Sequence, residues 1–199
     1  MQTIITGNYE FIVENLDVNK FRNGNIIPEI KSNEDWIKAG KECKPAWCYY
    51  DNDSENGKKF GKLYNWYAVN DPRKLAPKDW HIPAYGEYTA LIKEMDKNSN
   101  SLKAIGQDDI STNSSGFSGL LAGFRGENAE FCRIGIRAAF WCSTEHDKES
   151  AYVMSLFFEE FDIKLTDEFK EYGFSVRCIK ESASHKVSDV LFKNHRLGD

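Results

Sequence analysis

Five cysteines are the side chains of this sequence with the widest range of possible chemistry. They are Cys43, Cys48, Cys132, Cys142 and Cys178. No two of them have the two-residue spacing that structural zinc sites repeat, so we expect no zinc site. The odd number leaves at least one free thiol. Both buried reduced thiols and a partial disulfide framework fit this pattern, and the sequence leaves the two open.

A second group with possible chemistry is acidic. Asp51, Asp53 and Glu55 have the alternate spacing with which a calcium-binding loop begins. The twelfth position of such a loop must carry a bidentate acid, and here it is Lys62. We therefore predict a solvated polar turn over residues 51–57 rather than a calcium site.

His81 is the histidine whose surroundings can be interpreted most directly. It lies between Trp80 and Ile82 and is followed by Pro83, a rigid and largely apolar setting. A hydrogen-bonded structural histidine fits this setting better than a general base of a Ser/His/Asp arrangement. We predict no catalytic residue and no cofactor.

The charge balance excludes several classes of partner. The net charge is -5 and no run of five or more Lys or Arg occurs, so binding to nucleic acid is not expected. No run of 18 apolar residues is present, and residues 1–7 lack the basic start and long apolar centre of a signal peptide. These features predict a chain without a membrane-spanning segment that is soluble as given or has lost a leader.

The chain must next supply elements that position these side chains. Its 199 residues, with 14% aromatic residues, suit one domain with a core built on rings. Residues 9–13 alternate like a strand. Ser32, with an acid three residues later, predicts the start of a short helix that ends at Gly40.

The strongest periodic pattern predicts a helix over residues 85–96. Apolar residues recur there at positions i, i+3, i+4 and i+7, while charged residues occupy the other faces. The apolar positions are Tyr88, Leu91, Ile92 and Met95.

The residue pattern in the second half of the chain predicts a loop that is followed by a sheet. Residues 107–118 are rich in Ser, Thr, Asn and Gly and predict a loop. Residues 138–142, 151–158 and 174–179 predict three strands of a small antiparallel sheet. We expect Trp66, Trp80, Trp141 and Phe174 to meet in one core, with Gly61 and Gly173 allowing close backbone approach.

Six segments, taken in order, resemble one known bacterial family, the Fibrobacter succinogenes major paralogous domain. The resemblance covers about residues 5–180 and implies an α+β, C-type-lectin-like fold with two helices, small antiparallel sheets and long loops. The implied fold is of the branch shared with formylglycine-generating enzymes and with the variable proteins of diversity-generating retroelements. The segments are Asn-Leu-Asp-Val from Asn15, Phe-Arg-Asn-Gly from Phe21, Gly-Lys-Leu-Tyr-Asn-Trp-Tyr-Ala-Val from Gly61, Trp-His-Ile-Pro from Trp80, Trp-Cys-Ser-Thr-Glu from Trp141 and Gly-Phe-Ser-Val-Arg-Cys from Gly173.

The resemblance implies one domain over residues 1–180 and a polar tail over residues 181–199. It also implies a secreted or cell-surface location, although no leader is visible and a cytoplasmic location stays open. Cys48 and Cys178 lie in family-typical segments and are expected to be neighbours, either as a disulfide or as two thiols.

The function expected from this resemblance is a non-catalytic module that binds a protein or a glycan. The alternatives are a structural or adhesive component of a surface assembly and, less favoured, a formylglycine-generating-type enzyme or a retroelement variable protein. The loop sequences with which true C-type lectins bind sugar through calcium are not present, and a fold does not by itself assign a ligand.

The expected binding face lies on the last strands and their turns. Because Tyr152, Met154 and Leu156 share one strand face, a core role for this stripe is the main alternative. The neighbouring acidic stretch, residues 157–162, interleaves rings with carboxylates, as a recognition surface does and a sealed core does not. The predicted ligand-binding residues are Glu145, His146, Asp147, Tyr152, Met154 and Phe158.

Overall fold

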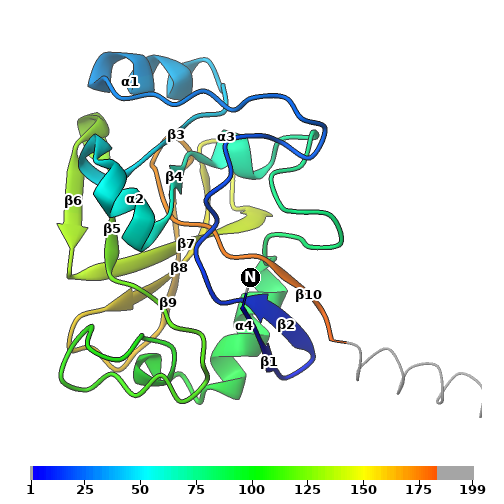
Figure 1. Ribbon diagram of the computed structural model, residues 1–199, viewed down its shortest axis with the longest axis vertical. Helices are drawn as coiled ribbons and strands as arrows, with labels where there is room; N and C mark the ends of the chain where they lie inside the picture. The colour runs from blue at the N-terminus through cyan, green and yellow to red at the C-terminus, as the bar shows by residue number, and fades with distance from the viewer. Residues whose placement is uncertain (1, 183–199) are drawn as a thin grey trace, which may run out of the picture.

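A computed structural model describes residues 2–182 as a mixed α+β fold of short helices around several small antiparallel sheets (Figure 1). The predicted tail lies outside the described residues from position 183 onward. The strands are β1 (Thr3–Thr6), β2 (Tyr9–Ile12), β3 (Trp47–Cys48), β4 (Leu63–Tyr64), β5 (Ala122–Arg125), β6 (Phe131–Ile134), β7 (Arg137–Glu145), β8 (Ser150–Phe157), β9 (Lys164–Phe169) and β10 (Ile179–Glu181). The α-helices are α1 (Asn33–Lys41), α2 (Ser54–Phe60), α3 (Trp66–Val69) and α4 (Tyr85–Glu94), and the 3-10 helices are η1 (Tyr50–Asn52), η2 (Ser99–Ser101) and η3 (Glu127–Ala129).

The central sheet has the order β7-β8-β9 and carries the longest strands. Its register places Trp141 opposite Val153 and Tyr152 opposite Asp167. Between Trp141 and Glu145 the pairing shifts, which marks a bulge at the end of β7. Most of β7 and β8 is buried, so this sheet forms the middle of the core.

A second sheet joins the two ends of the domain. In the order β1-β2-β10, Ile179 of the last strand pairs with Phe11 near the start of the chain. Figure 1 shows this sheet close to α4, at the opposite end of the molecule from α1. Because β2 and β10 lie far apart in the sequence, this sheet forms only when these two segments come together.

The two predicted helices are present as α1 and α4, and the structure adds the short helices α2 and α3 to them. Ser32 accepts a hydrogen bond from the backbone N–H of Asp35 at the start of α1. Helix α4 begins after Ala84, whose backbone N–H donates 2.7 Å to the Glu87 carboxylate. The other oxygen of Glu87 lies 2.7 Å from Nε2 of His81, so this histidine is hydrogen-bonded as predicted. Its hydrogen bond with Glu87 raises the pKa of His81.

The predicted ring core is confirmed. Trp66, Trp80, Trp141 and Phe174 belong to one cluster of buried side chains. Trp141 meets Phe174 edge to face with ring centroids 4.8 Å apart, and its indole N–H donates 2.7 Å to the carbonyl of Tyr64. The core therefore combines ring packing with a satisfied polar group.

Gly173 lies where the chain passes close to this core. A Cβ built on it would come within 3.0 Å of the Trp36 ring and 3.1 Å of Cβ of Arg125. The predicted close backbone approach at this glycine is thus confirmed.

Two predicted segments differ from the structure. Residues 51–57 are not a plain turn, because Asp53 accepts from the N–H of Glu55 and starts helix α2. Residues 174–178 are extended but belong to no strand. Their backbone groups bond to several different segments, including Tyr64 and Trp141. A segment that divides its hydrogen bonds in this way keeps a strand-like sequence without forming a ladder.

Two buried arginines hold the irregular segments in place. The Arg125 guanidinium donates to carbonyl oxygens of residues 30–32 and of Ala129. Arg177 donates to the carbonyls of Ile12, Phe117 and Ser118, and burial lowers its pKa to about 10. Each guanidinium thus satisfies several backbone carbonyls of segments that lie far apart in the sequence.

All five cysteines are free thiols, which decides between the alternatives left open by the sequence. Cys48 and Cys178 are both buried but lie in different core clusters. Burial raises the pKa of each to about 12. They behave as small apolar core residues.

Candidate functional site

The turn between β7 and β8 is held from inside by a buried lysine. Lys170 forms an ion pair with the Glu145 carboxylate and donates to the carbonyl oxygens of Asp147 (2.7 Å) and Lys148 (2.8 Å). Its side chain is almost completely buried, with its ammonium 4.9 Å from the centroid of the Trp66 ring. The Glu145 carboxylate therefore helps to fix the shape of this turn.

Asp147 closes the same turn with its own carboxylate. Its Oδ1 accepts from the backbone N–H groups of Glu149 and Ser150, both at 2.8 Å, and from the Ser150 hydroxyl at 2.9 Å. These bonds favour the ionised form and lower the pKa of Asp147 to about 2. The turn that presents His146 is thus rigid on both sides.

The His146 ring packs on the Tyr152 ring beside this turn. The two rings meet edge to face with centroids 5.1 Å apart. Nδ1 of His146 lies 3.0 Å from the Ser150 hydroxyl and 3.7 Å from a carboxylate oxygen of Asp167 on β9. Two strands and one turn therefore hold this imidazole.

A third ring comes from the first residue of helix α4. Tyr85 lies 4.5 Å from Tyr152 between ring centroids and is 40% exposed. Its backbone N–H donates 2.9 Å to the Thr144 hydroxyl, which attaches the helix to the bulge of β7. We call His146, Tyr152 and Tyr85 the ring row.

A shallow groove of ≈ 380 Å³ continues from Tyr85 between α4 and β9. Thr89 and Ile92 line it from the helix, and Leu165 lines it from the strand. We call it the α4–β9 groove. The ring row and this groove together combine exposed aromatic faces, hydroxyls and charged groups, as ligand sites do.

The structure divides the six predicted binding residues into two groups. Glu145, His146, Asp147 and Tyr152 lie together at one end of the β7–β8 hairpin, although the two carboxylates are engaged in holding the turn. Met154 is completely buried in the core below them. Met154 therefore supports this surface from within the core and does not contact solvent.

Phe158 lies at the other end of the hairpin. It follows the last residue of β8, and its backbone N–H donates 2.8 Å to the carbonyl of Ile136. Its ring is 42% exposed and that of Phe161 is 63% exposed. The acidic stretch is therefore exposed, as its sequence predicts, but it lies away from the ring row.

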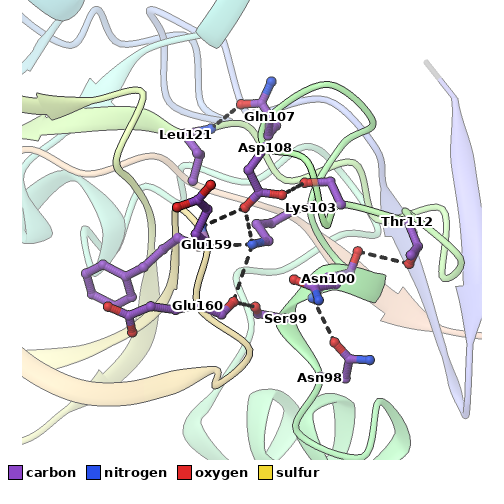
Figure 2. A network of polar contacts seen from close by, with 12 residues as sticks. Asn98, Ser99, Asn100, Lys103, Gln107, Asp108, Thr112, Leu121, Glu159 and Glu160 are labelled. Carbon is purple, nitrogen blue, oxygen red and sulfur yellow. Dashed lines mark hydrogen bonds and ion pairs between the residues drawn. The ribbon is translucent and has the colours of Figure 1, made fainter.

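The acidic stretch rests on a buried ion pair, shown in Figure 2. The ammonium of Lys103 pairs with the Asp108 carboxylate and donates to the carbonyl oxygens of Phe157 (3.0 Å) and Glu160 (3.3 Å). The backbone N–H of Glu159 donates 2.9 Å to the same carboxylate. This network ties the loop after α4 to the turn between β8 and β9.

Tyr85 and Thr144 are the members of this surface that the sequence interpretation did not include. Pro83 just before the helix is the one signal that could have drawn attention to Tyr85, because it fixes where the helix begins. No local pattern shows that this helix start contacts the bulge of β7.

The sequence model of the Fibrobacter succinogenes major domain matches residues 5–180. The chain belongs to this family. The match includes every residue of the ring row and of the α4–β9 groove. No curated protein matches the sequence of this Fibrobacter major domain protein.

Two further observations concern metals and membranes. Within residues 2–182 of this Fibrobacter major domain, no group of three or more His, Cys, Asp or Glu side chains could hold a metal ion. In the same part of the chain, no helix has the length and apolar character that crossing a bilayer requires.

Proposed function

We propose that this domain is a non-catalytic ligand-binding module of a secreted or cell-surface protein, built on a C-type-lectin-like scaffold. The observation that carries the proposal is the ring row, a set of partly exposed rings next to a groove and held in fixed positions. Aromatic faces bind apolar faces of sugars or side chains of proteins with little loss of entropy, because the rings are already ordered. The proposed ligand is a glycan or a protein.

The hydrogen bonds around His146 support a binding role over a catalytic one. In a Ser/His/Asp triad the two ring nitrogens bond to different partners, so that the imidazole can pass a proton between them. Here the Ser150 hydroxyl and Asp147 both approach Nδ1, at 3.0 and 3.3 Å. The Ser150 hydroxyl itself donates to Asp147. This arrangement supports a role in fixing the turn rather than in activating a nucleophile.

A structural or adhesive component of a surface assembly is the second proposal, and it has its own observation. Phe158 and Phe161 are exposed on a turn that the buried Lys103 network holds rigid (Figure 2). Exposed rings on a rigid turn suit a fixed contact with a neighbouring subunit.

The experiment that separates the two proposals is an array of glycans and extracellular proteins probed with the purified chain. The test variant combines Tyr85→Ala with Tyr152→Ala, and the matched control is Phe158→Ala. We expect the wild type and the control to bind the same spots, while the double variant loses about tenfold or more in affinity. Equal binding by the double variant and the wild type contradicts the ring row as the site. Loss of binding in Phe158→Ala instead favours the assembly role.

The proposed location has a separate test. Surface biotinylation of intact cells that make the full-length protein should label it. Labelling only after lysis contradicts a cell-surface location.

A further inference from the structure

A second groove, of ≈ 520 Å³, lies between α1, η3 and the turn that follows β9. Phe169, the last residue of β9, and Tyr172, in the turn after it, line the groove with rings, and Glu127 and Glu171 also line it. Lys41, in the last turn of α1, also lines it. None of these residues belongs to the ring row or to the α4–β9 groove. We call it the α1–η3 groove.

Its aromatic side is ordered and partly exposed. The Phe169 ring is 51% exposed and meets Tyr172 edge to face with centroids 5.7 Å apart. Tyr172 stacks on Phe124 at 6.3 Å with an angle of 25° between the planes. The rings are therefore fixed before any partner arrives, so binding would cost little ordering entropy.

Its charged side is acidic. Glu127 and Glu171 are exposed, and neither forms an ion pair with another residue between positions 2 and 182. Burial and then the charges of Glu127, Glu168 and Glu171 raise the pKa of Tyr172, which places its phenol among carboxylates. Glu168 is already paired with Arg137 at 2.7 Å. Two carboxylates without an ion-pair partner among residues 2–182 thus line the same groove as the rings.

Two rings next to Phe169 and Tyr172 already accept guanidinium groups of this chain. The guanidinium carbon of Arg137 lies 5.0 Å from the centroid of Phe124, the ring on which Tyr172 stacks. The guanidinium carbon of Arg125 lies 4.5 Å from the Trp36 ring, whose indole N–H donates to the carbonyl of Glu171. This part of the fold therefore favours planar cations against aromatic faces.

We propose that the α1–η3 groove binds an arginine side chain of a partner protein. The guanidinium would lie against the exposed face of Phe169 or Tyr172 and would donate to the carboxylates of Glu127 and Glu171. Arginine fits better than lysine, because its planar group stacks on rings and donates to carboxylates through a fixed set of N–H groups. Lys41 opposes the incoming charge and weakens the binding.

The test uses a capped pentapeptide, Gly-Gly-Arg-Gly-Gly, titrated into the ¹⁵N-labelled full chain and followed by the amide signals of the protein. Matched peptides carry lysine or citrulline in place of arginine, since citrulline keeps the shape and lacks the charge. We expect saturable shifts at Glu127, Asn128 and Tyr172 with the arginine peptide, weaker shifts with lysine and none with citrulline. Raising the salt concentration should weaken the binding, because the site is exposed.

Four variants make the assignment specific. Glu127→Gln and Glu171→Gln should each weaken binding about two- to fivefold, the range of an exposed ion pair. Phe169→Ala should weaken it about two- to fivefold, the range of an exposed cation–π contact. Lys41→Gln should strengthen it by a similar factor. Circular dichroism spectra equal to that of the wild type exclude unfolding as the cause.

Three results overturn the proposal. The first is the absence of saturable shifts in these amides at millimolar arginine peptide. The second is binding of the citrulline peptide with the same affinity as the arginine peptide, which shows that the groove recognises the shape of the side chain and not its charge. The third is unchanged affinity in Lys41→Gln together with both Glu→Gln variants, which places the peptide elsewhere.

Discussion

Replacing Lys103 with Met should destabilise the domain more than any surface substitution. The side chains of Lys103 and Asp108 are both 0% exposed, so the lysine is the buried counter-charge of a buried carboxylate. Without it, Asp108 keeps only the hydrogen bonds from the Ser111 hydroxyl and the backbone N–H of Glu159. Removing one partner of a buried pair costs about 3 to 5 kcal/mol, because the other charge stays buried without compensation.

Urea unfolding followed by circular dichroism measures this cost. For a slope of about 2 to 3 kcal/mol per molar urea, the midpoint should fall by roughly 1 to 2.5 M. The double variant Lys103→Met with Asp108→Asn removes both charges and keeps an acceptor for Glu159. It should therefore be at least about 1 kcal/mol more stable than Lys103→Met alone.

The pH dependence gives a second readout of the same pair. Burial acts to raise the pKa of Asp108, but hydrogen bonds from Lys103, Ser111 and the N–H of Glu159 outweigh it and the pKa lies below its usual value. The wild type therefore gains stability from this carboxylate above its unfolded pKa and loses it as pH falls through the folded pKa. The difference in unfolding free energy between the wild type and Lys103→Met should therefore become smaller at acid pH. A variant within 1 kcal/mol of the wild type at neutral pH, or a double variant no better than Lys103→Met, refutes the reasoning.

The other predictions concern the core, a histidine and the thiols. Trp141→Ala should cost about 3 to 5 kcal/mol in thermal or urea melts, because its ring is fully buried; wild-type stability would contradict the ring core. The hydrogen bond with Glu87 raises the pKa of His81, so the protonated histidine stabilises the fold by less than about 1 kcal/mol at this exposed site. This stabilisation is present below pH 6.5 and is lost as pH rises through the folded pKa. The unfolding free energy of His81→Gln should therefore differ from that of the wild type more at pH 5 than at pH 8.5. Alkylation of the folded protein should label exposed Cys43 first and spare buried Cys48 and Cys178, and alkylation after unfolding without reductant should label all five cysteines.

The sequence predicts best those features that depend on local periodicity. Helix α4 follows from its apolar spacing, and its observed end at Glu94 lies two residues before the predicted one. The ring core follows from the large aromatic residues, which have few other places to be buried. Strand β9 has no such signal, because Lys164–Phe169 is an edge strand with polar side chains toward solvent.

The candidate site depends on contacts between distant parts of the chain. His146 and Tyr152 are neighbours on one hairpin, so a sequence pattern could place them together. Tyr85 joins them only because its backbone bonds to Thr144 across the bulge of β7. Local propensity contains no information about such a contact, since it is made by the tertiary fold.

The buried arginines have a consequence for how the sequence of this domain can vary. Arg125 and Arg177 bind mainly backbone carbonyls, which every amino acid possesses. Ile30 and Lys31 can therefore change side chains and keep the same anchoring bonds, as long as the backbone path is kept, whereas Phe117 is also a fully buried core ring. A library randomised at residues 30 and 31 should therefore retain far more folded members than one randomised at Arg125.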